Sequence, residues 1–129
     1  MCTSEATTRG VTVEVKSSYV PERSRPLENR WFFAYRIRIT NTGSEVVQLI
    51  NRHWVITDAT GHVEEVVGPG VVGEQPVLRP GEAFEYTSFC PLSTPFGTMR
   101  GSYEMTTPDG QTFSAEIAPF QLSEPLPEN

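Results

Sequence analysis

The sequence predicts an all-β domain, folded as an antiparallel β-sandwich of seven to eight strands. Apolar and polar residues alternate with a period of two in several short segments, which is typical of strands with one buried face. Eleven prolines and ten glycines, with no repeat period, separate these segments. No window of about eleven residues shows the helical period of 3.6. Packing of sheet on sheet is therefore the expected architecture.

The chain has 129 residues, and the usual size of domains predicts a single domain over 1–129. We expect an ordered core over about 10–122, with flexible tails at 1–9 and 123–129, because both ends are polar and lack periodicity. The two cysteines do not indicate a disulfide framework, which a domain of this size does not need.

The first two predicted strands surround a charged loop. Three valines alternate with polar residues at the start of the segment 11–20, which predicts a half-buried strand. The segment 21–29 has two prolines and no periodicity, so we expect a loop. The segment 31–40 has the strongest strand pattern of the chain. The residues on its apolar face are Trp31, Phe33, Tyr35, Ile37 and Ile39.

The next predicted strand, 46–57, changes phase along its length. Its apolar residues occupy odd positions at first and even positions later, which predicts a β-bulge near Asn51 or Arg52. A turn at 58–61 then leads into a return strand over 62–67.

Three further strands follow a glycine-rich connection, at 83–90, 99–106 and 112–117. Each shows alternation, and Phe120 and Leu122 are the last residues expected to pack. Besides the apolar face of 31–40, the expected core residues are Leu49, Phe84, Tyr86, Tyr103 and Phe113.

The net charge of −6 argues against a general nucleic-acid binder. The basic charge is uneven, however, and Arg36 and Arg38 share one face of a predicted strand. One interpretation is a solvated face whose arginines pair with glutamates of neighbouring strands. The other is a docking patch for an acidic protein segment or a phosphate.

Gly68, Gly70 and Gly73 form a G-x-G-x-x-G pattern, which in dinucleotide folds precedes a helix. Pro76 and Pro80 follow within a few residues, so no helix can form there. We therefore interpret the glycines as turn residues of a connecting loop. The alternative is an anion-binding nest of backbone N–H groups, with these glycines as a weak candidate site.

The sequence contains no recognisable catalytic constellation. His53 and His62 are the only histidines, and their spacing matches no metal motif. Cys90 has no evident base beside it, and we expect an inert, half-buried thiol. The expectation is a protein that is not an enzyme, without cofactor or metal.

Several motifs together resemble the ApaG family. They are WFFAYRIRITN, QLINRHWVITD, GPGVVGEQPVLRPGEAFEYTS and TPFGTMRGSYEM, within about 11–122. The resemblance implies a sandwich like that of fibronectin type III or immunoglobulin domains. It also implies a small stand-alone protein loosely linked to cobalt and magnesium resistance or efflux, without settled enzymatic activity. Related domains in larger proteins look like protein-interaction modules.

We therefore expect a protein–protein interaction module. The alternative is a sensor of a nucleotide, a dinucleoside polyphosphate or a divalent metal, bound through the glycine-rich loop. We expect residues 64–76 to form part of the docking surface, with the Arg36 and Arg38 patch as the second candidate. The apolar contact residues would be Val66, Val67, Val71 and Val72, unless these valines fold back on the core.

The expected setting follows from what the sequence lacks. It has no apolar run of about 18 residues and no secretory signal, so we expect a cytoplasmic protein without membrane insertion. An unidentified protein partner or an anionic small molecule is expected, with the chain itself a monomer or weak homodimer.

Overall fold

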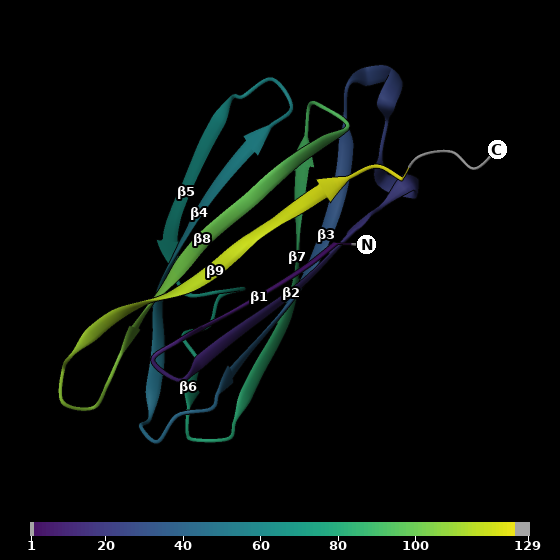
Figure 1. Cartoon of the computed structure of the whole chain (residues 1–129). Coiled ribbons are helices and arrows are strands. Elements are labelled where there is room, and N and C mark those ends of the chain that lie inside the picture. The colour runs from purple at the N-terminus through teal and green to yellow at the C-terminus, as the bar shows by residue number, and fades with distance from the viewer. Residues whose placement is uncertain (1, 126–129) are drawn as a thin grey trace.

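The computed structural model describes residues 2–125, which fold into two antiparallel sheets. One sheet has the order β1-β2-β3-β7, and the other has the order β5-β4-β8-β9 with β6 beside β4 (Figure 1). The strands are β1 (Cys2–Thr8), β2 (Val11–Tyr19), β3 (Trp31–Asn41), β4 (Val47–Asp58), β5 (Val63–Pro69), β6 (Val77–Leu78), β7 (Ala83–Leu92), β8 (Phe96–Thr106) and β9 (Thr112–Ser123). The predicted antiparallel β-sandwich is confirmed.

Helical structure in the described residues is limited to two short 3-10 turns, η1 (Pro21–Arg23) and η2 (Pro26–Glu28). Both lie in the proline-containing loop before β3, where the sequence predicts a charged loop. Within 2–125 no helix has the length and apolar character that crossing a membrane would require.

The core confirms the alternation predicted for β3. Phe33, Ile37 and Ile39 are fully buried, and Tyr35 is 6% exposed. Trp31, Phe84 and Phe113 are partly buried and pack against this core, while the other predicted core residues lie inside it. All of the predicted core residues therefore belong to the core or pack against it, and the three partly buried aromatic residues lie at its border.

The expectation of a flexible tail over 1–9 is wrong. Residues 2–8 form β1, which pairs with β2 in continuous register from Cys2 opposite Ser17 to Thr8 opposite Val11. The Ser4 hydroxyl also donates to the Ala118 carbonyl at 2.9 Å, across to β9. The sequence did not predict β1, because the face that β1 turns toward β9 carries small and polar residues. The segment therefore lacks an alternation of apolar and polar residues.

The C-terminal boundary also lies later than expected. The indole Nε1 of Trp31 donates to Glu124 Oε2 at 2.9 Å, and the Glu124 amide donates to the Pro95 carbonyl. Ser123 and Glu124 therefore belong to the ordered domain. The remainder of the predicted tail, 126–129, lies outside the described residues.

A β-bulge in β4 decides which side chains face the interior. The register between β4 and β8 shifts between Leu49 and Asn51, one residue before the predicted position. Beyond this shift the even-numbered residues turn inward, so that Trp54 joins the core and Ile56 packs against it. Arg52 has the same parity, and its side chain therefore lies on the inner face of the sheet.

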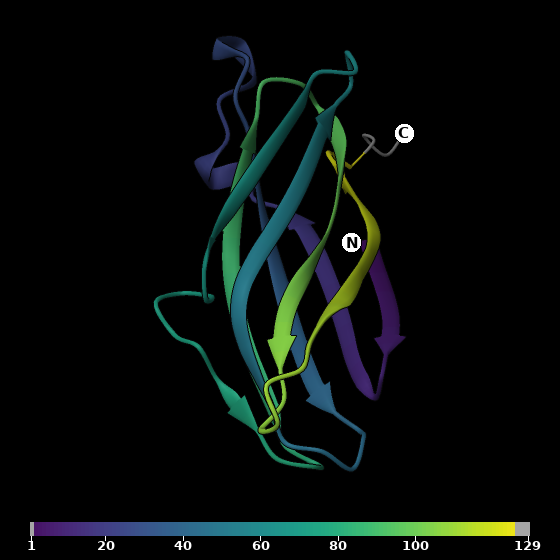
Figure 2. The ribbon, with the colours of Figure 1, turned by 90° about the vertical axis from the view of Figure 1, so that its left-hand side faces the viewer.

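The two sheets approach each other closely on one side only. On that side β1 and β9 lie together, and the Ser17 hydroxyl donates to the Gln121 carbonyl at 2.6 Å. On the opposite side β7 pairs only with β3, and β5 pairs only with β4. Figure 2 shows the two layers from the side that carries β4 and β5. The sandwich is thus closed along β1 and β9, and the outer edges of β5 and β7 have no neighbouring strand among residues 2–125.

Candidate functional site

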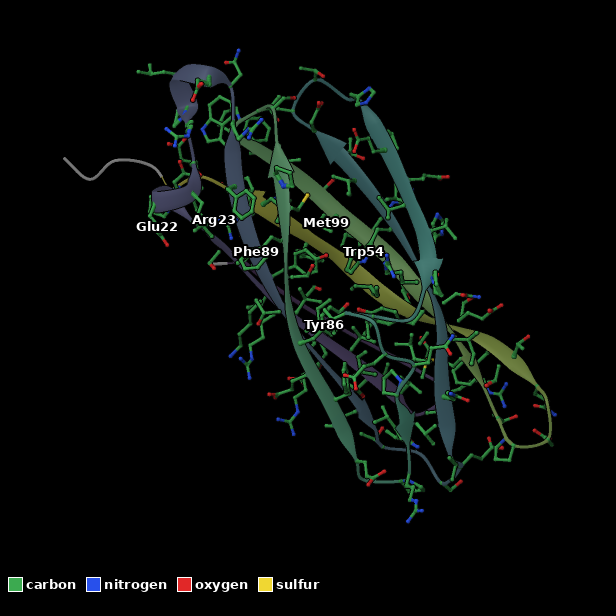
Figure 3. The ribbon with its side chains drawn as sticks, turned by 180° about the vertical axis from the view of Figure 1, so that it is seen from behind. Glu22, Arg23, Trp54, Tyr86, Phe89 and Met99 are labelled. Atoms are coloured by element: carbon green, nitrogen blue, oxygen red, sulfur yellow. The ribbon has the colours of Figure 1, made fainter. Side chains whose placement is uncertain are left out.

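A groove of about 470 Å³ lies between the sheets on the β5 and β7 side. Its floor contains Tyr35, Trp54, Tyr86 and Met99, which come from four different strands. Figure 3 shows Trp54, Tyr86 and Met99 between β7 and the β4–β5 pair. We call this feature the inter-sheet groove. Its aromatic and apolar floor is typical of sites that bind other molecules.

Aromatic contacts and a hydrogen bond join the residues of the floor to the core. The rings of Tyr35 and Trp54 meet edge to face at 5.4 Å, and Trp54 meets Tyr103 edge to face at 6.4 Å. The hydroxyls of Tyr86 and Tyr103 form a hydrogen bond with each other. Burial raises the pKa of both tyrosines above the ordinary value, so both are neutral at physiological pH.

Residue pairs between β4 and β5 form one side of the groove. Trp54 lies opposite Val66, and Ile56 lies opposite Glu64. At the other end Arg52 lies opposite Gly68. An arginine and a glutamate therefore border the groove at its two ends, with an apolar pair between them.

Gly68 makes room for the Arg52 side chain. A Cβ atom at position 68 would lie 2.9 Å from Nη2 of Arg52. The same guanidinium donates through Nη1 to the carbonyls of Pro69 and Gly70, at 2.9 and 3.0 Å. The first glycine of the pattern therefore leaves space for the Arg52 side chain, and two loop carbonyls point toward the Arg52 guanidinium.

Further backbone hydrogen bonds fix the loop against β4 and close a turn within it. Gly70 has a φ of +61°, and its amide donates to the Ile50 carbonyl at 2.8 Å. Val71 and Glu74 exchange two backbone hydrogen bonds of 2.8 Å, which close a tight turn around Gly73. No helix follows this turn within the described residues. The geometry agrees with the turn interpretation, and the N–H groups of Gly70, Val71 and Glu74 are already used.

The four candidate contact valines separate into three environments. Val66 and Val72 border the groove and are 38% and 57% exposed. Val67 is 72% exposed on the outer face of its sheet, beside His53. Val71 is 1% exposed and belongs to the core, so its expected role in a contact surface is wrong. The turn at 71–74 drives Val71 inward and its neighbour outward.

Arg36 and Arg38 lie on the outer face of the other sheet, away from the groove. Both donate to the Glu85 carboxylate, at 2.6 and 2.9 Å. The hydrogen bond from Arg36, with the nearby positive charges, lowers the pKa of Glu85. A hollow of about 470 Å³ covers this face and is lined mainly by charged and threonine side chains, Glu14 and Lys16 among them. Since both glutamates and cations line it, the face is a mixed ionic surface.

The groove is preferred over the equally large ionic hollow on physical grounds. The hollow lies on the flat outer face of a sheet whose charges already pair with each other. The groove combines a fixed aromatic floor with the unpaired edges of β5 and β7. Burial of an apolar side chain in the groove would release water from Val66 and Val72, which are exposed at its border.

The other residues considered from sequence do not converge. His53 approaches Glu65 at 3.8 Å, and His62 approaches Glu64 at 4.0 Å, on opposite faces of the sheet. Residues 2–125 hold no cluster of three histidine, cysteine or carboxylate side chains that could bind a metal. Cys90 lines the groove but is 5% exposed, and burial raises its pKa to about 11.

Sequence reasoning missed the groove itself. It assigned Tyr35 and Tyr86 to the core, which is correct, but it did not place them beneath a groove. The predicted docking segment 64–76 includes Glu64, whereas Arg52 was named only as a bulge position. The available signal was the predicted bulge in β4, because a change of phase there turns an arginine toward the inner face.

Comparison with known proteins agrees with this fold. The ApaG domain family model matches residues 21–107. "Protein ApaG" of Anaeromyxobacter dehalogenans (strain 2CP-C) is 57% identical over 122 residues, which cover 95% of this chain and 96% of that protein. "Protein ApaG" of Paramagnetospirillum magneticum is 58% identical over 119 residues, which cover 92% of each chain. The crystal structure of the "Putative ApaA Protein" from Bordetella pertussis superposes with a TM-score of 0.87 at 56% identity, and covers 89% of this chain and 94% of that one.

Proposed function

Because this chain belongs to the ApaG domain family, we propose that it is a binding module that holds an extended segment of a partner protein in the inter-sheet groove. The observation that supports this proposal is the groove itself, with an aromatic floor between two strand edges that have no neighbour among the described residues. The proposal assigns no chemical reaction to the groove. We further propose that the protein is cytoplasmic. Its loose link to cobalt and magnesium resistance or efflux would then act through the partner protein.

Strand edges favour a peptide as the occupant. The outer edges of β5 and β7 present backbone N–H and C=O groups that an added strand can bind. The side chains beside them supply pockets for alternate residues of such a strand, with Trp54 and Val66 on one wall and Tyr86 on the other. Backbone pairing would supply affinity, and the pockets would supply selectivity.

One observation favours the alternative, a phosphate-containing small molecule. Arg52 places a guanidinium at the end of the groove, beside the glycine-rich loop. Against this alternative, two loop carbonyls share that guanidinium, and three loop amides already donate to backbone carbonyls, two of them within the loop and one to Ile50 of β4. The same loop would have to rearrange before it could surround a phosphate or a divalent metal.

The test uses two adjacent valines of β5 as a matched pair. Peptides selected from a random displayed library on the wild-type protein are titrated by fluorescence polarisation against Val66→Arg and Val67→Arg. Val66 borders the groove, whereas Val67 is on the outer face of the same strand. We expect Val66→Arg to weaken binding about tenfold or more and Val67→Arg to leave it unchanged, because only the first blocks a buried contact.

Thermal unfolding of both variants controls for loss of the fold. Equal binding by the wild-type protein and Val66→Arg would contradict the proposal. So would peptides whose binding is lost in Arg36→Ala and retained in Val66→Arg, since the partner would then use the ionic face. Micromolar binding of ATP or of a dinucleoside polyphosphate, with no peptide recovered, would favour the alternative.

A further inference from the structure

The groove carries one positive and one negative charge at fixed positions, and these positions specify a partner. This inference rests on the proposed peptide-binding function. Along the wall formed by β4 and β5, three residue pairs follow one another: Arg52 with Gly68, Trp54 with Val66, and Ile56 with Glu64. Arg52 and Ile56 are four residues apart on one strand, so the two charged rows are about 13 Å apart. Residues i and i+4 of an extended peptide span the same distance.

Neither charge has a strong partner inside the protein. Among residues 2–125 no carboxylate lies within 4.0 Å of the Arg52 guanidinium. Its bonds to the Pro69 and Gly70 carbonyls use Nη1, which leaves Nη2 as a donor. In the same part of the chain, the one cationic group within 4.0 Å of the Glu64 carboxylate is His62, at 4.0 Å. Both charges are therefore available to side chains of a bound segment.

The direction of β7 relates the two charges to the chain direction of an added strand. A smaller hollow at the Glu64 end also contains Pro91 and Leu92, which end β7. Strand β7 thus runs toward Glu64 and away from Arg52. A strand antiparallel to β7 begins at the Glu64 end and finishes at the Arg52 end.

Burial favours addition to β7 over addition to β5. Strand β9 contacts both β1 and β2 on the closed side, so the second sheet reaches past β7 on the open side. A strand on the edge of β7 would extend the sheet that ends there, and its inward side chains would face the inner surface of β5. A strand on the edge of β5 would lie beyond β7, and its inward side chains would have no facing layer among the described residues. Apolar burial is therefore larger in the first arrangement.

We propose that the groove recognises an extended segment that adds antiparallel to β7 and carries a basic, an apolar and an acidic side chain at positions i, i+2 and i+4. The basic residue pairs with Glu64, and the apolar residue packs on Val66, above the buried Trp54. The acidic residue accepts hydrogen bonds from Arg52. The two ionic contacts select the segment and its direction, and the apolar contact supplies most of the buried area.

Synthetic peptides of about ten residues, the length of an ordinary strand, test the charge order. One peptide contains Lys-x-Leu-x-Glu in an otherwise fixed threonine-rich sequence, a second contains Glu-x-Leu-x-Lys, and a third contains Ala-x-Leu-x-Ala. Binding is measured by fluorescence polarisation at low and high salt. We expect the first peptide to bind about threefold or more tightly than each of the others at low salt, because each half-exposed ion pair contributes modestly and salt screens it.

Adjacent glutamates of β5 provide a matched control. Glu64 borders the groove, and Glu65 lies on the outer face beside His53. A fourth peptide, with Glu-x-Leu-x-Glu, is added for this comparison. We expect Glu64→Lys to bind this fourth peptide best, while Glu65→Lys still prefers Lys-x-Leu-x-Glu. Both positions are exposed, so both variants are expected to fold.

The outcomes separate this inference from the function on which it rests. If peptides bind in the groove, with loss in Val66→Arg, but show no charge order, the recognition pattern is wrong and the binding function stands. A preference for Glu-x-Leu-x-Lys would place the added strand on β5 and overturn the proposal. If all three peptides bind Val66→Arg as well as the wild-type protein, the proposed function fails too. Self-association blocked by Val66→Arg, without peptide binding, would identify a second copy as the occupant and would also overturn it.

Discussion

Gly70→Ala distinguishes a structural from a ligand-binding role of the glycine-rich loop. Gly70 has a φ of +61°, which alanine tolerates poorly. A Cβ atom at this position would lie 2.3 Å from the Glu74 carbonyl oxygen and 3.0 Å from its carbon. Both contacts are with backbone, so rotation of a side chain cannot relieve them. The variant must therefore shift the turn that follows Gly70.

The cost has two parts. Placing alanine at positive φ costs about 1 kcal/mol. The carbonyl that the Cβ atom would strike accepts the Val71 amide at 2.8 Å, and this bond helps to hold the buried Val71 side chain in the core. Displacement of the turn weakens that bond and the packing of Val71, at roughly 2 kcal/mol. The expected total is therefore about 3 kcal/mol.

Gly73→Ala is the matched control from the same loop. Gly73 has a φ of +81°, but a Cβ atom there would have no neighbour within 4 Å. It should lose only the conformational part, about 1 kcal/mol. The difference of about 2 kcal/mol corresponds to a melting temperature lower by about 8 °C in Gly70→Ala, at about 4 °C per kcal/mol for a chain of this size. Urea unfolding followed by tryptophan fluorescence measures the same difference.

Two results would refute this reasoning. Equal stability of the two variants would show that the steric contact with Glu74 does not determine the cost. A Gly70→Ala protein as stable as the wild type that no longer binds a nucleotide would show that the loop serves an anion, contrary to the hydrogen bonding of its amides.

Three further predictions concern the buried polar groups of the groove floor. Tyr103→Phe leaves the Tyr86 hydroxyl without its partner and should lower the free energy of unfolding in urea by about 1–3 kcal/mol. Adding Tyr86→Phe should recover part of this loss. A double variant less stable than Tyr103→Phe alone would contradict this prediction. Because burial raises the folded-state pKa of both tyrosines above the ordinary 10.0, their protonated forms favour the folded state, and the melting temperature should be insensitive to their ionisation below pH 10 and fall above it. The double phenylalanine variant should show a shallower fall, and an equal fall would refute the assignment. Cys90, with its pKa raised to about 11, should react with a thiol reagent at pH 8 more slowly than the half-buried Cys2, and equal rates in single-cysteine variants would contradict its burial.

The sequence by itself determined the fold class and most of the core. Alternation along 31–41 places Phe33 and Ile37 on a buried face, and burial of alternate residues is a local property that a strand carries with it. The phase change in 46–57 likewise indicated the bulge to within one residue. Turn glycines were recognisable because their backbone conformations exclude most other residues.

The tertiary structure decided which buried faces remain open. Nothing local distinguishes Trp54 from Leu49, since both are buried, but only Trp54 lies beneath a groove, because the facing sheet ends at β7. Strand β1 has no apolar pattern of its own, and it exists through pairing with β2 and contact with β9. Val71 and Val72 are identical neighbours, yet they are 1% and 57% exposed. A single backbone turn, with Val72 at a φ of +43°, separates them. The local hydrogen bonds between Val71 and Glu74 close this turn, and the bond from the Gly70 amide to Ile50 places it against β4.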